Sequence, residues 1–241
     1  MPSSDITKYF EELHEKCGQI LTASMAGPNS ETIAKSHQFA YELKEWCNIL
    51  ENRTEVELLR VAAMEYELAL LALIQGHYRH AFKALRLVLE LSLQAVHLSV
   101  NEICLREWLD NRIDTVWDLI IDKEAGVFST RFAKAFFPDL IQHVQHHRGL
   151  AIAIYRECSE CVHGNNPRHI PLPTALDFNQ EVFELWHSKA EVVALVLHFA
   201  MSIRYLPGLL ATQIAVVEKF LTDRLGHLEE IRQLLGGPAK G

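Results

Sequence analysis

The chain has 241 residues, of which 49% are hydrophobic and 22% are charged, and its formal net charge at pH 7 is −8. This composition supports a sizeable core and excludes wholesale disorder. The negative net charge argues against a protein that coats nucleic acid non-specifically.

Helical spacing of apolar residues runs along almost the whole chain, with no convincing period-two strand pattern. Gly27-Pro28, Gly76 and the proline-rich segment 165–173 should interrupt it. Asn29 or Ser30 is the expected cap of the second helix, and Thr54 followed by Glu57 is a capping-box signal for the third. We therefore expect helices over residues 5–26, 29–50, 54–74, 77–100, 102–109, 113–121, 129–137, 138–164, 179–205 and 207–235.

The short connections between these helices imply antiparallel neighbours, so the predicted fold class is an all-α, antiparallel helical bundle. We find no internal repeat and no low-complexity block. Gly27-Pro28 is the strongest candidate boundary, but the two helices around it are too short to stand alone. We therefore treat residues 1–241 as a single domain, with a frayed tail after Leu235.

The cellular location is inferred from what the sequence lacks. Residues 1–30 are polar and amphipathic, unlike a signal peptide. The longest apolar run, Val192 to Ile203, is too short to span a membrane and contains His198. We expect a cytoplasmic protein that does not interact with a membrane.

Two groups of residues have the spacing of metal ligands. The five cysteines form no disulfide framework, but Cys158 and Cys161 make a CxxC pair, with His163 as a possible third ligand. A zinc site usually needs a second ligand pair, and cysteine within a helix commonly serves as a small apolar residue. His143, His146 and His147 could cup a metal or form a solvent-facing stripe. Because no carboxylate lies at matching phase, we predict neither metal nor cofactor.

The segment from Tyr155 to Asn165 is the most informative part of the chain. Arg156 and His163 are seven residues apart, which is close to two helical turns, so they share one face with Ser159 and Glu160 between them. This stripe combines a permanent cation, a hydroxyl, a carboxylate and an imidazole, which could hold an anion and move a proton. It could equally be the polar end of an amphipathic helix, where a histidine is favourable toward the helix dipole.

A second pair, Arg86 and Glu90, lies one turn apart on the predicted helix 77–100. Arginine before glutamate is the poorer order for an isolated helix pair, so helix stabilisation is a weak reason for it. The pair could be a solvated or partly buried ion pair, or it could line the same cleft as Arg156. Residues 77–86 carry three basic residues and two histidines but no acid, which suits a compact anionic ligand or a short RNA.

These two elements together resemble the HEPN superfamily, a group of small α-helical proteins that includes many ribonucleases of toxin–antitoxin and phage-defence systems. Arg156 to His163 matches the RxxxxxxH motif, and residues 155–165 resemble the Y-x-x-x-S-x-x-V-H-G ending of an uncharacterised bacterial branch. Gly76 to Glu90 resembles that branch's earlier helix, G-x-Y-x-x-A-x-x-x-x-R-x-x-x-E. The match covers about residues 70–165 and implies a HEPN-like core of about residues 54–205. Residues 1–53 would add an N-terminal helical pair, and residues 206–241 a C-terminal helix and tail.

The resemblance implies a metal-independent endoribonuclease. His163 would move the proton of the ribose 2′-OH or of the leaving 5′-oxygen, and Arg156 would hold the phosphate. Ser159 or Glu160 would orient the imidazole, while Asn165, Arg86, Glu90 and Tyr155 would bind substrate. Expected partners are RNA or a nucleotide, a second copy in a homodimer, and an antitoxin or sensor protein.

One departure from the family pattern favours a second interpretation. Active members often carry Asn, Asp or His directly after the arginine, whereas this chain has Glu157. The alternative is therefore a non-catalytic HEPN-like module that binds a nucleotide, an RNA or a protein.

Overall fold

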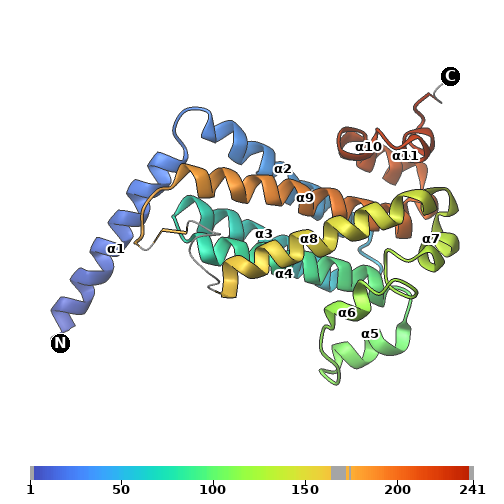
Figure 1. The fold of residues 1–241 in the computed structure, drawn as a ribbon, viewed down its shortest axis with the longest axis horizontal. Coiled ribbons are helices and arrows are strands. Elements are labelled where there is room, and N and C mark those ends of the chain that lie inside the picture. Colours follow the sequence, from blue (N-terminus) through green and yellow to red (C-terminus); the bar gives the residue numbers. More distant parts are fainter. Residues whose placement is uncertain (1–2, 164–171, 174, 239–241) are drawn as a thin grey trace.

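The computed structural model describes residues 3–163, 172–173 and 175–238, and these form helices without any strand (Figure 1). The all-α prediction is therefore confirmed. In chain order the helices are α1 (Ser3–Ser24), α2 (Asn29–Ile49), α3 (Val56–Ile74), α4 (Tyr78–Leu98), α5 (Glu102–Leu109), α6 (Trp117–Ile120), α7 (Thr130–Phe136), the 3-10 helix η1 (Pro138–His143), α8 (Val144–His163), α9 (Gln180–Tyr205), η2 (Leu206–Gly208), α10 (Ala211–Leu225) and α11 (Glu229–Leu234).

The centre of the fold is the antiparallel hairpin of α3 and α4. Helix α8 packs on α4, α9 packs on both α4 and α8, and α2 covers α3 (Figure 1). Trp46 and Trp186 are fully buried, while Trp108 and Trp117 are partly buried against the same core, as expected of aromatic anchors. Helices α10 and α11 close one end of the bundle, and most of α1 extends away from it (Figure 1).

Helix α9 is the most deeply buried element. Among the described residues, Gln180–Gly208 is one segment long and apolar enough to cross a membrane by length and composition. However, 72% of its most apolar window is buried inside the fold. The second half of α9, from Val192 to Ile203, is buried on nearly every side, which is typical of a helix at the centre of a bundle.

Two predicted helices are each divided in the structure. The expected helix 138–164 is the 3-10 helix η1 followed by α8, because Pro138 opens a short, tight turn before the α-helix begins at Val144. The expected helix 207–235 becomes η2, α10 and α11. Gly226 ends α10 where a Cβ atom would lie 2.3 Å from the carbonyl oxygen of Thr222, so only glycine fits this turn.

The predicted caps of α2 and α3 were wrong. Neither helix has a side-chain cap hydrogen bond, and α3 begins at Val56 after Glu55 rather than at Thr54. The Glu55 carboxylate instead accepts hydrogen bonds from Arg53 and from Tyr205 of α9. The Asn29 side chain exchanges hydrogen bonds with Gln180 at the start of α9. Asn29, one of the two predicted caps of α2, is thus used in a tertiary contact instead.

Gly76 was expected to end the third helix, and the turn between α3 and α4 does require it. Its φ is +80°, and a Cβ atom there would lie 3.1 Å from the Ile20 side chain of α1. Gly76→Ala should therefore lower the free energy of unfolding by about 1–2 kcal/mol, because it adds both backbone strain and a close contact. Urea denaturation would measure the change.

Gly18 provides the matched control for that substitution. It lies inside α1, and an added Cβ would meet no atom within 4 Å. Gly18→Ala should raise the free energy of unfolding by about 0.5–1 kcal/mol, since alanine is the better helix former. Equal effects of the two substitutions would contradict the role given to Gly76.

Candidate functional site

Helix α8 divides its residues among three faces. Ala151, Ile154, Cys158 and Cys161 are buried against the core, which fixes the rotation of the helix. Arg156, Glu160 and the position of His163 share the outward face, since one residue turns a helix by about 100°. Tyr155 and Val162 lie between these two faces, on the side of α4. The structure therefore places Arg156 and Glu160 on one face of α8.

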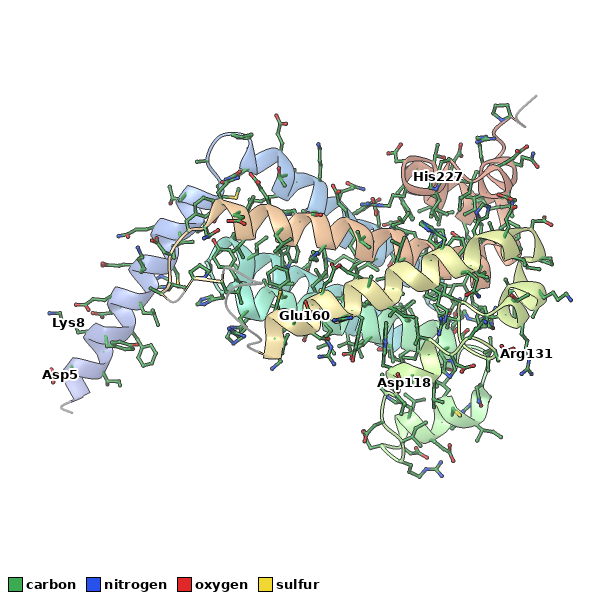
Figure 2. All side chains as sticks on the ribbon, in the orientation of Figure 1. Asp5, Lys8, Asp118, Arg131, Glu160 and His227 are labelled. Atoms are coloured by element: carbon green, nitrogen blue, oxygen red, sulfur yellow. The ribbon has the colours of Figure 1, made fainter. Side chains whose placement is uncertain are left out.

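Arg156 is the most open charged group of this stripe. Its side chain is 79% exposed, and its Nε donates a hydrogen bond of 3.1 Å to Oε1 of Glu160, one turn later. Figure 2 shows Glu160 near the C-terminal end of α8. An exposed ion pair of this kind contributes only about 0–1 kcal/mol, so an anionic ligand could separate it at little cost.

The other members of the predicted site are only partly placed by the structure. The Ser159 hydroxyl donates to the carbonyl oxygen of Tyr155 at 2.7 Å, so it is occupied by its own helix. His163 is the last residue of α8, and its side chain is outside the described part of the chain. Asn165 also lies outside the described residues.

Arg86, Glu90 and Tyr155 do come together. Nη2 of Arg86 donates to Oε1 of Glu90 at 3.1 Å and to the hydroxyl of Tyr155 at 2.6 Å, and its guanidinium lies 4.5 Å from the Tyr155 ring centre. The same ring stacks on Trp117 at a centroid distance of 4.0 Å. Burial and the Glu90 carboxylate raise the pKa of Tyr155, while Arg86 opposes them. The Arg86–Glu90 pair is thus partly buried and joins α4 to α8.

This cluster borders an open groove between α3, α4 and the end of α8, with a volume of about 480 Å³. Arg86 and Glu90 line the groove, as do the exposed bases His80 and Lys83. Val162 also lines it, so the groove reaches the last turn of the motif helix. Glu65 lines it together with Glu90, so the groove combines charges of both signs with an apolar floor of leucine and alanine side chains.

Arg79 is a residue that the sequence reasoning did not single out for this site. Its Nη1 donates to the carbonyl oxygens of Cys161 and Val162, at 2.8 and 3.2 Å. These are orphan carbonyls at the C-terminus of α8, and a cation is favourable there. Arg79 therefore holds the turn that presents His163. In the sequence, the one indication of this role was the segment 77–86, which contains basic residues and no acid.

Glu157, the residue that departs from the family pattern, faces away from this site. Its carboxylate pairs with Lys189 of α9, on the side of α8 opposite Tyr155. It therefore links α8 to α9, whereas Arg156 points to solvent. In this arrangement, Glu157 does not contact the arginine that it follows.

The candidate metal ligands include His163, whose side chain lies outside the described part of the chain. Among the residues that the structure describes, no group of three or more His, Cys, Asp or Glu side chains could hold a metal ion. Burial raises the pKa of the Cys158 thiol to about 12 and that of Cys161 to about 11, as expected of cysteines that act as apolar residues.

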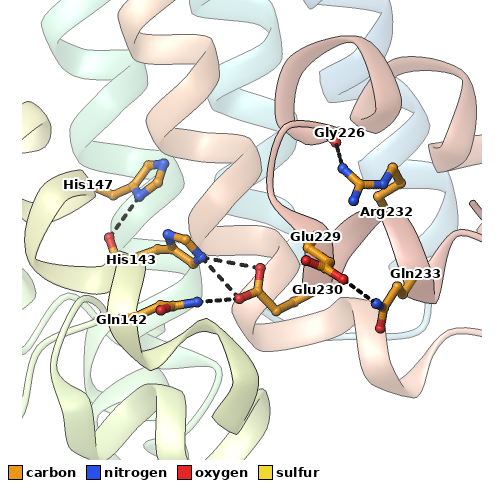
Figure 3. Close-up of polar contacts among 8 residues, drawn as sticks. All are labelled: Gln142, His143, His147, Gly226, Glu229, Glu230, Arg232 and Gln233. Carbon is orange, nitrogen blue, oxygen red and sulfur yellow. Dashed lines mark hydrogen bonds and ion pairs between the residues drawn. The ribbon is translucent and has the colours of Figure 1, made fainter. Parts of the chain in front are cut away.

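The predicted histidine stripe on α8 was wrong for His147. Its ring is buried and stacks on Phe199 with the centroids 3.5 Å apart. Figure 3 shows His143 turned instead toward Glu230 of α11, at 3.2 Å from both carboxylate oxygens. These histidines thus join helices to each other and do not form an open face.

No family model, curated protein or solved structure matches the chain. Functional inference therefore depends on the residues themselves.

Proposed function

We propose that this protein is a HEPN-like endoribonuclease that cleaves RNA without a metal ion. The observation that carries the proposal is Arg156, whose exposed guanidinium stands on the outward face of α8, two turns before His163. The groove that reaches Val162, the residue before His163, also holds Lys83 and Arg86 as candidate phosphate contacts, together with the carboxylates of Glu65 and Glu90. In this proposal the bundle of α3, α4, α8 and α9 is of the HEPN type.

The proposed chemistry is an internal transfer at phosphorus. The ribose 2′-oxygen loses its proton to the imidazole of His163 and attacks the adjacent phosphorus atom. The bond from phosphorus to the 5′-oxygen breaks, and that oxygen takes a proton from an imidazolium. Arg156 donates hydrogen bonds to the non-bridging oxygens, where negative charge builds. The products are a 2′,3′-cyclic phosphate and a 5′-hydroxyl, so DNA, which lacks the 2′-OH, should resist cleavage.

The remaining groups bind and orient. Arg156 must first separate from Glu160. Because this ion pair is exposed, breaking it costs little free energy. Arg79 holds the last turn of α8 through two carbonyl oxygens and so positions His163. The resemblance further implies a homodimer in which two copies of the Arg156–His163 set meet, one imidazole acting as base and the other as acid. An antitoxin or sensor protein would regulate it.

The test is cleavage of single-stranded RNA by the purified protein in the presence of EDTA, with single-stranded DNA as the second substrate. We expect RNA cleavage that survives EDTA, no cleavage of DNA, and a loss of about 100-fold or more in rate for His163→Ala and for Arg156→Ala. His146, an exposed histidine on the same helix, supplies the matched control, and His146→Ala should retain full activity. Cleavage that disappears in EDTA or persists in His163→Ala would overturn the proposal.

A second function is favoured by the hydrogen bonds within the stripe. Arg156 is paired with Glu160, and the Ser159 hydroxyl is bound to its own helix, so neither group is poised for catalysis. Under this alternative the protein binds a nucleotide or RNA without cutting it. The same preparation would then bind RNA in a gel-shift or polarisation assay, leave it intact, and lose affinity on Arg156→Ala.

A further inference from the structure

Helix α1 carries one apolar stripe along its length, but the body of the protein covers only half of it. Ile6, Phe10, Leu13, Cys17 and Ile20 recur at helical spacing on one face. Cys17 and Ile20 are buried at the turn between α3 and α4, where Ser24 Oγ also donates to the Ile74 carbonyl oxygen at 3.1 Å. The C-terminal half of α1 is thus firmly attached.

The first half of the same stripe has no cover. Ile6, Tyr9 and Phe10 are exposed, Phe10 at 59% of its surface, and Leu13 is half-buried. Figure 2 shows Asp5 and Lys8 far out on α1, away from the rest of the chain. We call residues 5–13 the α1 arm. Three large apolar side chains on a projecting helix are unfavourable in water, because burying each of them would lower the free energy of the protein.

A second uncovered apolar surface lies on the α3–α4 hairpin. Met64, Leu68 and Leu71 of α3 are exposed, Met64 at 63%, and Leu87 of α4 lies beside them. Leu68 and Leu87 line the 480 Å³ groove already described. Ala72 and Ala84 line it too, and their small side chains leave room for larger ones to enter.

We propose that the α1 arm of one copy of this chain docks into the α3–α4 groove of a second copy, and that the exchange is reciprocal. The arm belongs to one continuous helix fixed at Cys17 and Ser24, so it cannot turn back onto its own hairpin without breaking. Only another copy brings the two uncovered surfaces together. Reciprocal exchange of a terminal element is an economical route to a closed, two-fold dimer.

The charges of the two surfaces are complementary. The arm, residues 5–13, carries three acids and one lysine. The groove end nearest the α3–α4 turn has His80 and Lys83 on its rim, with Arg79 beside them and no acid from residue 77 to residue 86. Glu65 and Glu90, which also line the groove, lie farther from that turn. The acidic arm therefore fits the turn-proximal, basic end, and complementary charge favours this orientation of encounter.

The proposed contact does not depend on the ribonuclease proposal, although it touches the same region. Val162 lines the groove, so a docked arm would lie beside the last turn of α8 in the partner. Association and RNA cleavage are measured separately, so loss of the arm contact and loss of activity are told apart. A monomeric wild type would count against both proposals, because each includes a homodimer.

The experiment uses an arm variant, Phe10→Glu, and a groove variant, Leu68→Glu, in the full chain. Both positions are exposed, so both variants should fold and keep the wild-type helical content. By sedimentation velocity, the wild type should be a dimer, and each variant should dissociate with a Kd raised at least about thirtyfold. Ile103→Glu, at an exposed apolar residue of α5, is the matched control and should remain dimeric.

Mixing decides between this contact and a symmetric one. An equimolar mixture of Phe10→Glu and Leu68→Glu chains keeps one intact arm facing one intact groove, so it should form a heterodimer more stable than either variant alone. The double variant Phe10→Glu/Leu68→Glu should not associate with itself. In a Cys104→Ser background, chains with Ile6→Cys should form disulfides with chains carrying Leu68→Cys. A monomeric wild type, dimeric single variants, or a mixture without rescue would each overturn the proposal.

Discussion

The free energy of unfolding should fall by at least roughly 3–4 kcal/mol between pH 7 and pH 5, because buried histidines, among them His147 and His187, must stay neutral in the folded protein. Burial lowers the pKa of His147 and of His187 to about 4. In the unfolded chain the imidazole titrates near pH 6.5. Below that pH the unfolded state binds protons that the folded state does not bind. The histidines' contribution to the free energy of unfolding is therefore fully present above about pH 6.5 and declines toward pH 4.

The surroundings of both rings explain the low pKa values. His147 Nδ1 donates to the His143 carbonyl oxygen at 2.9 Å, while its Nε2 is buried with no partner in the described part of the chain (Figure 3). His187 Nδ1 lies 2.6 Å from the Ser36 hydroxyl, and its Nε2 is likewise buried and unpaired. A second proton on either ring would create a buried positive charge on a nitrogen that has neither a hydrogen-bond acceptor nor access to solvent.

Urea unfolding at several pH values measures this effect directly, since each such histidine contributes a slope of about 1.4 kcal/mol per pH unit. His147→Phe keeps a flat ring against Phe199 and removes one titrating group. In this variant, the slope of the unfolding free energy against pH between pH 5 and pH 6 should therefore be smaller by about 1.4 kcal/mol per pH unit. His37 is exposed, so His37→Gln is the control and should follow the wild-type profile. A stability that is flat between pH 7 and pH 5 would contradict the assignment.

The sequence predicted the helices well where apolar periodicity was long and uninterrupted. The helix 102–109 matches α5 at both ends, and the ends of α3 and α9 differ from prediction by at most two residues. The errors fall where a single residue acts through a tertiary contact. Gly226 interrupts the C-terminal helix, and Glu55 binds Tyr205 where a Thr54 capping box was expected. Apolar periodicity is a property of one segment, so it cannot predict contacts between segments that are distant in the sequence.

The candidate site was predictable as a helical face but not as a set of contacts. Seven-residue spacing placed Arg156 above His163, and the structure keeps both on α8. The role of Arg79, which binds the carbonyl oxygens of Cys161 and Val162, depends on the packing of α4 against α8. The engagement of Glu157 by Lys189 depends in the same way on α9. Arg79 is about 80 residues from Cys161 in the sequence, and Lys189 is about 30 residues from Glu157. Spacing within one helix therefore could not predict either contact.

Arg224→Met should lower the free energy of unfolding by about 3 kcal/mol, because Arg224 is the counter-ion of a buried carboxylate. Glu42 of α2 is only 3% exposed. Its Oε2 accepts from Arg224 Nε at 2.7 Å, and its Oε1 accepts from Arg224 Nη2 at 3.3 Å. Burial alone would raise the pKa of Glu42, but hydrogen bonds from His198 and Arg224 and the charge of Arg224 outweigh it and lower that pKa. Glu42 is therefore ionised in the folded protein.

His198 cannot replace Arg224 as the source of positive charge. Its Nδ1 accepts from Trp46 Nε1 at 3.1 Å, so the neutral ring carries its proton on Nε2 and donates it to Glu42 at 2.8 Å. Burial lowers the pKa of His198, which keeps the ring neutral. Within the described residues, Arg224 is thus the one ionised partner of this carboxylate, and it joins α10 to α2.

A double-mutant cycle separates the buried charge from simple loss of packing. Methionine keeps much of the arginine stem, so the cost of Arg224→Met arises mainly from the unpaired carboxylate. Adding Glu42→Gln removes that charge while an amide oxygen can still accept from His198, and the double variant should recover most of the lost stability. Arg60→Met breaks the exposed pair with Glu57 and should cost no more than about 0.5 kcal/mol. If Arg224→Met cost as little as Arg60→Met, then water would be reaching Glu42 through the neighbouring groove of about 470 Å³, and the network could not be what fastens α10 to the bundle.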